Sequence, residues 1–328
     1  MSDVERIETR LDTEATVSIV VPCYNEEEVI GTFHQRLVSE ISRISDVSFD
    51  ILFVDDGSSD ETLSALEAIE ATDGRAKVYS LSRNFGHQAA LTAGLSVATG
   101  NAVICMDADL QHPPSLIGRM IESWKAGCDI VWAVRKDTEG VSFVKTGSSR
   151  LFYRLINAIS DTPIIPGAAD FYLLGQAPLQ ALRSMPERHR FLRGMISWIG
   201  FRQEFIDYTA QSRNAGTSKY TYRKMIDLAL DAVFSFSPRP IRLISKAGVV
   251  VAALGGAYLL YVIAMLFLSP RVVPGWASMV GVVCVLGGFQ LIATGIIGEY
   301  LARVFEEAKG RPLYIFKRKP EPEERHTS

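Results

Sequence analysis

Two long apolar stretches near the carboxyl end of this 328-residue chain constrain its fold most strongly. No charged residue occurs from Ala247 to Pro270, and none occurs from Val272 to Gly298. Each stretch exceeds the roughly 20 residues that a helix needs to cross about 30 Å of hydrocarbon. Both contain scattered Gly and Ala, which allow close contact between helices, so we favour a membrane hairpin over a buried hairpin of a soluble protein. We expect the hairpin over 243–298, with spans near 247–269 and 276–298.

The charges around these stretches predict their orientation. Arg239, Arg242 and Lys246 precede the first stretch, whereas the loop SPRVVPG between the two stretches carries a single Arg. Basic residues again follow the second stretch, in the segment 299–328, for which we expect a cytoplasmic helix and a loose, charged tail. By the positive-inside rule, we expect both ends of the chain in the cytoplasm. For the location we expect the plasma (inner) membrane. The polar amino terminus, 1–16, reads as a flexible segment, neither a signal peptide nor a further anchor.

Composition excludes some functions. The chain has 34 Lys and Arg against 37 Asp and Glu, a formal net charge of −3. A general nucleic-acid binder needs a clustered excess of basic residues, so we expect no nucleic-acid partner. The four cysteines are far apart and lack the spacing of a zinc site, which predicts reduced core thiols. They are Cys23, Cys105, Cys128 and Cys284.

Residues 17 to about 135 alternate β-branched runs with helical patterns. The runs are VSIVVP, FDILFVDD, AKVYSLS, NAVICMDAD and CDIVWAVR, and we expect helices from Glu26, from Ser59, near His87 and from Pro113. This alternation predicts a doubly wound, mostly parallel α/β sheet. Ligands of such sheets bind beyond the carboxyl ends of the strands. Functional residues are therefore expected at those ends.

The rest of the soluble part is less regular. From 136 to 220 we expect a helix over Phe143 to Ile159, a short strand FYLL and a helix near Arg190 to Trp198, all within one domain that spans 17–220. Segment 221–242 alternates apolar with charged residues just before the first apolar stretch. An amphipathic helix in the membrane interface fits this pattern better than a plain core helix.

Two strand ends carry polar groups suited to a nucleoside. VPCYNEEE, residues 21–28, offers an aromatic ring beside acidic groups, although acids in a first helical turn also simply complement the helix dipole. FVDDGSSD, residues 53–60, ends a buried strand in two aspartates, with Gly57 for the turn and a serine to cap the next helix. An aspartate there can accept hydrogen bonds from a base or a ribose. A capping turn without a ligand is the alternative for each motif alone.

The stretch DADLQHPP, residues 107–114, is the third strand end. In an extended segment alternate side chains share a face, so Asp107 and Asp109 can point the same way. Two neighbouring carboxylates repel unless a cation lies between them, and Mg²⁺ or Mn²⁺ with oxygen ligands suits them and can also hold a diphosphate. Gln111 can add a carbonyl oxygen. His112, before a proline, fits a surface or packing residue better than a metal ligand, and a polar turn remains the alternative to a metal site.

Two further features could serve an active site. Asp170 precedes the short strand FYLL, where it is either a loop acid or a catalytic acid. The segment QSRNAGTSKYTYRK, residues 211–224, is rich in Gly, Ser and basic residues. Its cations could attract anionic lipid headgroups, or they could hold the phosphates of a substrate that the membrane delivers.

Taken together, these motifs resemble the family-2 glycosyltransferases of GT-A fold, most closely the polyprenyl-phosphate glycosyltransferases such as bactoprenol glucosyltransferases and dolichol-phosphate mannose synthase. The resemblance covers nearly the whole chain and rests on the stretches SIVVPCYNE, DDGSSD, LSRNFGHQAAL, DADLQHPP, ADFYLL, RNAGTSKY, FSFSPRPIRL and GEYLARVFEEAKGRPLY. One departure is visible. The family often has Arg two residues after the aspartate, where this chain has Tyr172.

The resemblance implies roles for individual residues. The nucleotide-sugar donor would be bound by Pro22, Tyr24, Glu26, Val54, Asp56, Asp107, Ala108, Arg135 and Lys219. Asp107, Asp109 and Gln111 would hold Mg²⁺ or Mn²⁺, and Asp109 and Asp170 would be the catalytic acids. Arg213, Ser218 and Lys219, in a loop that closes on the donor, would reach the acceptor phosphate.

The implied reaction is the inverting transfer of a sugar from a nucleotide sugar, such as UDP-glucose, to polyprenyl (undecaprenyl) phosphate. A phosphate monoester has a second pKa near 6 and needs no strong base, so we expect Asp170 to orient a substrate rather than remove a proton. A different lipid or polysaccharide acceptor is the alternative within the enzyme class, and a sugar-lipid flippase or scaffold is the non-enzymatic one. The absence of GxGxxG after the first strand excludes a nucleotide-cofactor dehydrogenase. The sequence leaves the oligomeric state open; by the same resemblance, a homo-oligomer such as a tetramer is one expectation.

Overall fold

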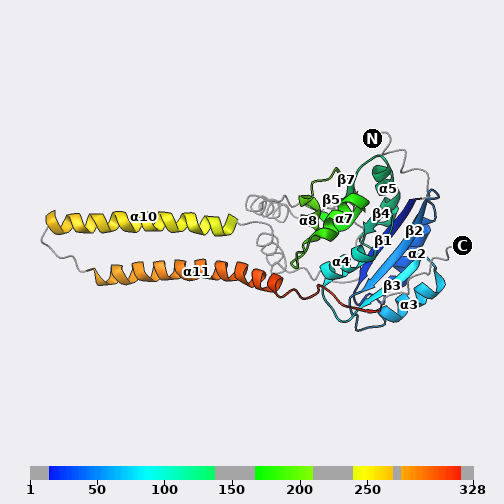
Figure 1. Cartoon of the computed structure of the whole chain (residues 1–328), viewed down its shortest axis with the longest axis horizontal. Coiled ribbons are helices and arrows are strands. Elements are labelled where there is room, and N and C mark those ends of the chain that lie inside the picture. Colours follow the sequence, from blue (N-terminus) through cyan, green and yellow to red (C-terminus); the bar gives the residue numbers. More distant parts are fainter. Residues whose placement is uncertain (1–14, 137–166, 210–238, 269–274, 319–328) are drawn as a thin grey trace. The chain divides into compact units, whose positions relative to one another are not determined.

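The computed structural model describes residues 15–136, 167–209, 239–268 and 275–318 (Figure 1). The described residues fall into two compact units. One is an α/β unit of residues 15–136, 167–209 and 312–318, and the other is a helical unit of residues 239–268 and 275–311.

The α/β unit is built on one eight-stranded sheet with the order β7-β5-β6-β4-β1-β2-β3-β8. The pairs β1–β2, β1–β4, β2–β3 and β5–β7 are parallel, whereas β4–β6, β5–β6 and β3–β8 are antiparallel. The predicted mostly parallel α/β sheet is therefore confirmed. The strands are β1 (Ala15–Cys23), β2 (Val47–Asp55), β3 (Ala76–Leu81), β4 (Ala102–Cys105), β5 (Ile130–Lys136), β6 (Ala168–Gly175), β7 (Gln203–Thr209) and β8 (Phe316–Arg318).

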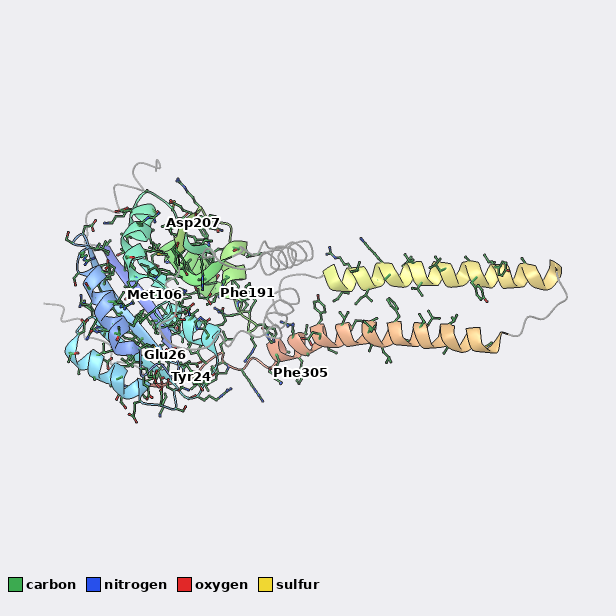
Figure 2. All side chains as sticks on the ribbon, turned by 180° about the vertical axis from the view of Figure 1, so that it is seen from behind. Tyr24, Glu26, Met106, Phe191, Asp207 and Phe305 are labelled. Atoms are coloured by element: carbon green, nitrogen blue, oxygen red, sulfur yellow. The ribbon has the colours of Figure 1, made fainter. Side chains whose placement is uncertain are left out.

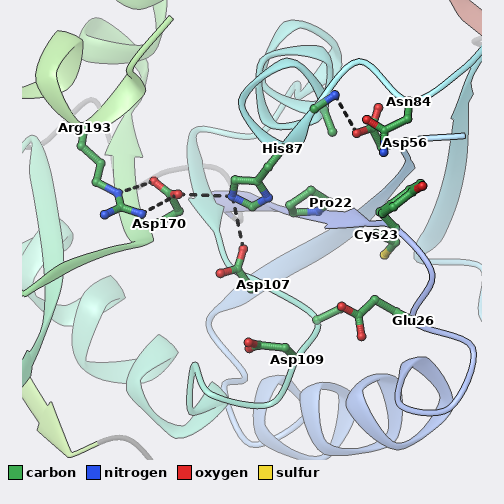
Figure 3. A pocket seen from close by; sticks show the side chains of 14 residues that line it. Pro22, Cys23, Glu26, Asp56, Asn84, His87, Asp107, Asp109, Asp170 and Arg193 are labelled. Carbon is green, nitrogen blue, oxygen red and sulfur yellow. Dashed lines mark hydrogen bonds and ion pairs between the residues drawn. The ribbon is translucent and has the colours of Figure 1, made fainter. Parts of the chain in front are cut away.

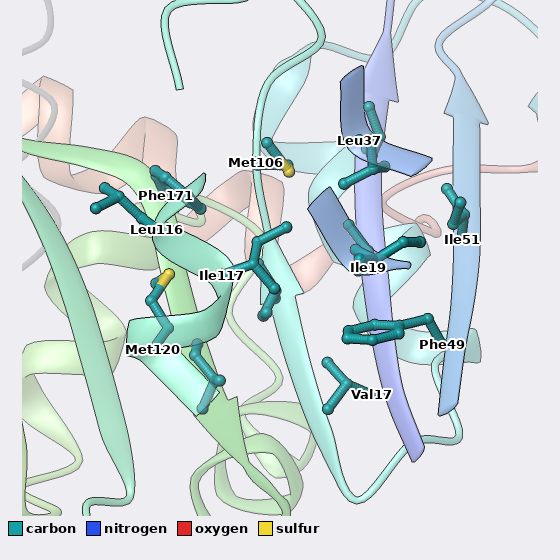
Figure 4. Packing of buried hydrophobic residues seen from close by; sticks show 14 of the residues in the cluster. Val17, Ile19, Leu37, Phe49, Ile51, Met106, Leu116, Ile117, Met120 and Phe171 are labelled. Atoms are coloured by element: carbon teal, nitrogen blue, oxygen red, sulfur yellow. The ribbon is translucent and has the colours of Figure 1, made fainter. Parts of the chain in front are cut away.

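Helices cover both faces of this sheet. In β1, Ile19 belongs to the large core beneath α2 and α5, whereas its neighbour Val20 faces α4, because successive side chains of a strand point to opposite faces. Figure 4 shows the first of these layers, with Leu37 and Ile117 packed over the sheet. The helices are α2 (Ile30–Ile41), α3 (Thr62–Thr72), α4 (His87–Val97), the 3-10 turn η1 (Pro114–Leu116), α5 (Ile117–Lys125), α7 (Gln176–Ser184) and α8 (Leu192–Trp198).

Several predicted elements differ in their limits. The strand in NAVICMDAD ends at Cys105, so Asp107 and Asp109 lie in a turn rather than in an extended segment. The helices expected at Glu26 and Ser59 begin at Ile30 and Thr62, after a turn in each case. Helix α7 and strand β7 were not predicted. The helix expected over 143–159 and all of the interface helix before residue 239 lie outside the described residues.

The helical unit contains α10 (Arg239–Leu268) and α11 (Trp276–Ala308), which lie side by side (Figures 1 and 2). Both are long and apolar enough to cross a membrane. Their apolar side chains do not form a protein core: Leu254 is 67% exposed and Leu291 is 75% exposed. Exposure of this kind contradicts the alternative of a buried soluble hairpin and suits contact with lipid. Residues 299–308, expected as a separate helix, continue α11.

The expectation of a loose tail after Arg311 is wrong for residues 312–318. Strand β8 pairs antiparallel with β3 at the edge of the sheet, and Ser82 donates its backbone N–H to the carbonyl oxygen of Ile315 over 2.8 Å. The Tyr314 hydroxyl lies 2.8 Å from Ser96 Oγ, and Arg318 contacts two glutamates of α3, Glu67 and Glu70, at 2.7 and 2.8 Å. The charges that made this tail look loose therefore fasten it to the sheet edge.

Truncation of the chain after Arg311 is expected to lower the melting temperature of the α/β unit by about 4–8 °C. The two half-buried rings of Tyr314 and Phe316 contribute roughly 2 kcal/mol, and a domain of this size shifts by about 2–4 °C per kcal/mol. Differential scanning fluorimetry in detergent measures the effect. The matched control ends after Arg318, which keeps β8. Equal melting temperatures for the two truncated chains would show that β8 adds no stability.

Candidate active site

A pocket of about 390 Å³ lies at the carboxyl ends of β1, β2 and β4, beside the first turn of α4 (Figure 3). This is the position at which open α/β sheets bind ligands. Its size suits a small molecule. The residues that line it are Pro22, Cys23, Tyr24, Glu26, Asp56, Asn84, Gly86, His87, Ala90, Asp107, Ala108, Asp109, Asp170 and Arg193.

The end of β1 forms one wall of the pocket, and Tyr24 and Glu26 lie on it (Figure 2). The Tyr24 ring is 45% exposed, so its face is accessible to a planar ligand. Asn25 adopts a left-handed backbone conformation, with φ of 54°, and its Oδ1 accepts the Ser59 backbone N–H over 2.9 Å. This bond ties the turn after β1 to the turn after β2, and so it fixes the tyrosine that lies between Asn25 and the strand.

The two aspartates that end β2 have different surroundings. Asp55 is buried and accepts hydrogen bonds from Ser80 Oγ over 3.0 Å and from the Ser58 backbone N–H over 3.1 Å, which gives it a structural role. Asp56 lines the pocket and accepts the backbone N–H groups of Phe85 and Gly86 over 2.7 and 2.9 Å. Burial raises the pKa of Asp56, and these two N–H groups oppose that shift.

Val54, for which the resemblance implies a role in donor binding, is not among the residues that line the pocket. Its side chain is fully buried and packs with Leu81, Ala90 and Ala93 under α4. This side chain therefore supports the end of β2 from the core.

Gly57→Ala is expected to lower the stability of the α/β unit by roughly 2–6 kcal/mol. Gly57 has a φ of 66°, and an added Cβ would lie 2.4 Å from the backbone carbon of Arg83. Strain in the left-handed region and overpacking each cost roughly 1–3 kcal/mol. Thermal unfolding of the detergent-solubilised protein measures this loss. Gly31→Ala is the matched control, because its Cβ would meet no atom within 4 Å. A Gly57→Ala variant that melts like the wild type would contradict the close approach of Gly57 to the backbone of Arg83.

The aspartates of DADLQHPP lie in the turn after β4. Asp109 accepts hydrogen bonds from the Gln111 backbone N–H over 3.0 Å and from its side-chain amide over 2.8 Å. His112 is buried, stacks on Phe171 with ring centroids 5.1 Å apart, and accepts the Asp107 backbone N–H at Nδ1 over 2.9 Å. His112 therefore shapes the turn, as its expected packing role predicts.

Asp107 presents an unsatisfied oxygen to the pocket. Its Oδ1 is buried and accepts no hydrogen bond from the described residues. His87 Nε2 lies 3.5 Å away and forms an ion pair with it when the imidazole is protonated. Burial raises the pKa of Asp107, against the opposing charges of His112 and His87. A buried carboxylate oxygen without a donor is costly unless a cation completes it.

A hard divalent cation fits these residues. Asp107 and Asp109 supply two carboxylates, whereas Gln111 Oε1 accepts a hydrogen bond from Arg135 Nη1 over 3.3 Å. Within the described ranges, no three His, Cys, Asp or Glu side chains are grouped to hold a metal ion by themselves. The donor set therefore suits Mg²⁺ or Mn²⁺ that takes further oxygens from a substrate or water, rather than a closed protein site.

Asp170 is the most constrained acid of the pocket. Its side chain is 4% exposed and accepts hydrogen bonds from Arg193 Nε and Nη2, both over 2.8 Å. His87 Nε2 lies 3.2 Å from the same carboxylate and Gln88 Nε2 lies 3.3 Å from it. Burial alone would raise the pKa of Asp170, but Arg193 and His87 outweigh it and hold that pKa far below its usual range.

The structure thus gathers most of the predicted residues and adds others. Arg135 is exposed and contacts Gln111 without lining the pocket, and Arg213, Ser218 and Lys219 lie outside the described residues. Sequence reasoning assigned no role to His87, Gln88 or Arg193. The strand-end rule could have drawn attention to residues 84–88, which follow β3, but nothing local identifies Arg193.

Comparisons with known proteins agree with the sequence pattern. The model of "Glycosyl transferase family 2" matches residues 18–179. An uncharacterised glycosyltransferase, YkcC of Bacillus subtilis, is 40% identical over 91% of this chain and 92% of its own length. The prophage bactoprenol glucosyl transferase homologue of Escherichia coli is 38% identical over 92% of this chain and 98% of its own.

Among solved structures, a mannosyltransferase from Pyrobaculum calidifontis, in complex with GDP-Man and Mn²⁺, aligns over 94% of both chains with a TM-score of 0.48 and 17% identity. The family match and the two relatives confirm the resemblance, the GT-A fold class and the assignment as a glycosyltransferase. The chain belongs to glycosyl transferase family 2.

Proposed function

We propose that this protein transfers a sugar from a nucleotide sugar, with UDP-glucose as the first candidate, to polyprenyl phosphate at the cytoplasmic face of the membrane. The observation that carries the proposal is the buried, unsatisfied Asp107 oxygen in a strand-end pocket, on a chain with two helices able to cross a membrane. Relatives named bactoprenol glucosyl transferase support the choice of a lipid acceptor.

The pocket supports a nucleotide-sugar donor. Asp56 and the exposed Tyr24 ring lie at one end, where a base and a ribose can be held by hydrogen bonds and stacking. Asp107 and Asp109 lie beside them and would hold Mg²⁺ or Mn²⁺ with the diphosphate. A metal bound there supplies charge neutralisation for the departing nucleoside diphosphate.

The acceptor needs little help from a base. A phosphate monoester has its second pKa near 6, so it is largely dianionic at pH 7. One of its oxygens forms a bond to the anomeric carbon while the bond from that carbon to the diphosphate oxygen breaks, which inverts the configuration. Asp170, already bonded to Arg193, His87 and Gln88, orients its neighbours in this scheme.

The arrangement of the chain suits a membrane-bound acceptor. The α/β unit precedes and follows the two apolar helices in the sequence, since β8 returns to the sheet after α11. We propose that the domain of 17–220 works in the cytoplasm beside the bilayer, that 221–242 lies in the interface, and that Arg213, Ser218 and Lys219 approach the acceptor phosphate. Tetramers are part of the same proposal.

The test is a transfer assay with purified protein in nanodiscs. A panel of UDP- and GDP-sugars is supplied with undecaprenyl phosphate and Mn²⁺ or Mg²⁺, and lipid-linked sugar is measured by mass spectrometry. Transfer from one donor, lost with EDTA, supports the proposal. Transfer to polysaccharide but not to lipid phosphate would favour the alternative acceptor, and no transfer from any donor would favour a flippase or scaffold.

A further inference from the structure

Arg193 is the single Arg or Lys among the described residues that line the pocket. Five carboxylates share this lining: Glu26, Asp56, Asp107, Asp109 and Asp170. An anionic acceptor is repelled by such a surface except where a cation interrupts it. The side chain of Arg193 is 31% exposed, so an anion in the pocket can reach it.

The contacts around Arg193 fix where its guanidinium lies. Asp170 binds it at two points, through Nε and Nη2, in the bidentate geometry that gives an arginine a defined orientation. Gln88 links the same parts, since its Nε2 lies 3.3 Å from Asp170 Oδ2 and its Oε1 accepts the Leu192 backbone N–H over 3.0 Å. Residues from α4, β6 and α8 therefore meet at one cation.

The contacts also give the order of groups along the pocket (Figure 3). Arg193 contacts Asp170, Asp170 contacts His87 at 3.2 Å, and His87 contacts Asp107 at 3.5 Å. Asp56 lies toward the other end, bonded to the backbone N–H of Gly86. A donor with its nucleoside near Asp56 and its diphosphate near Asp107 would place its sugar toward Asp170 and Arg193. The attacking group must arrive on that side.

The strand that carries Asp170 supplies no other cation there. Tyr172, where the family often has Arg, is fully buried and packs against Trp132, with ring centroids 5.2 Å apart. It therefore presents no polar group to a ligand in the pocket.

We propose that Arg193 binds the phosphate of the acceptor and that Asp170 and Gln88 are positioning residues for it. This inference rests on the proposed function and names the acceptor subsite of the same pocket. A lipid phosphate and a free phosphate share the chemistry that a guanidinium recognises, so the experiment supplies both.

The test measures binding and transfer with Arg193→Gln and Arg193→Lys. Affinity for a short-chain polyprenyl phosphate, and separately for inorganic phosphate, is measured by calorimetry with UDP and Mn²⁺ present. We expect Arg193→Gln to weaken lipid-phosphate binding and to raise its KM by about 10–100-fold, and Arg193→Lys to do so by a smaller factor, because lysine keeps the charge without the planar fork. UDP affinity should stay within about twofold of wild type, because the nucleoside diphosphate would lie toward Asp56 and Asp107 rather than at Arg193.

Arg119→Gln is the matched control, since it removes an exposed arginine from α5 that does not line the pocket. Melting temperatures show whether each variant folds. If Arg193→Gln does not fold, the phosphate affinity of Arg193→Lys, which keeps a cation beside Asp170, tests the inference instead. Unchanged phosphate affinity, or a loss of UDP affinity by the same factor, would overturn the inference. Wild-type protein that binds lipid phosphate through Arg193 but transfers no sugar would defeat the proposed function alone, and binding of inorganic phosphate without lipid phosphate would overturn the lipid assignment.

Discussion

Asp107→Asn is expected to lower kcat/KM for sugar transfer by at least about 100-fold. The Asp107 Oδ1 atom is buried without a hydrogen-bond donor, and a metal ion is the group that would satisfy it. Asparagine keeps the shape but removes the negative charge that a hard cation needs. Loss of several kcal/mol of charge stabilisation in the transition state corresponds to at least this factor in rate.

The measurement is a Mn²⁺ titration of transfer rate for wild type and variant. The variant should need a higher Mn²⁺ concentration and should bind UDP with Mn²⁺ more weakly, while its melting temperature without metal should equal or exceed that of wild type, because a raised pKa marks a carboxylate that burial destabilises. Asp46→Asn is the matched control, since Asp46 is exposed and precedes β2, at the opposite end of that strand from the pocket. Wild-type activity that persists in EDTA would contradict a metal at Asp107.

The central strands could be predicted because their residues are buried on both faces. β1, β2 and β3 appear in the sequence as β-branched runs, and each is followed by a helix. The position of β6 between β4 and β5 could not be predicted, because its two antiparallel pairings join segments far apart in the chain. The sequence FYLL indicates a strand, but nothing in it indicates that β4 and β5 are its neighbours in the sheet.

Part of the candidate site could likewise be predicted from the sequence, and part could not. Tyr24, Asp56 and Asp107 each follow a strand, so the strand-end rule brings them together from the sequence alone. The hydrogen bonds that hold Asp170 depend on tertiary contacts instead. Gln88, one of the donors, also bonds to Leu192, 104 residues further along the chain. No periodicity or motif reports such a contact. The β8 strand was missed for a related reason, since its charges are paired by glutamates of α3 that the local sequence does not contain.

Asp170→Asn is expected to reduce kcat/KM for lipid phosphate by about 10–100-fold, mainly by raising KM, and to leave the shape of the pH–rate profile unchanged. Arg193 and His87 hold the pKa of Asp170 far below its usual range, so this carboxylate stays ionised at every pH above that range and does not titrate between about pH 5 and 9. Its stabilising charge is therefore present throughout the assay and is lost only in strong acid, as the pH falls toward the lowered pKa. An acidic limb near pH 6 that arises from the acceptor phosphate should appear in both proteins.

A general base would behave differently in each of these measurements. Removal of a base costs typically 100–10,000-fold in kcat, leaves substrate binding intact and abolishes the limb that reports its titration. Asp170 makes two contacts with Arg193 and lies within 3.3 Å of both His87 and Gln88, all of which donate to it. A carboxylate that is already surrounded by donors is a weak proton acceptor. If Asp170→Asn keeps wild-type affinity for lipid phosphate and UDP but loses kcat together with an acidic limb, Asp170 removes a proton and its assignment as a positioning residue fails. If KM for lipid phosphate rises and the acidic limb stays, Asp170 positions Arg193.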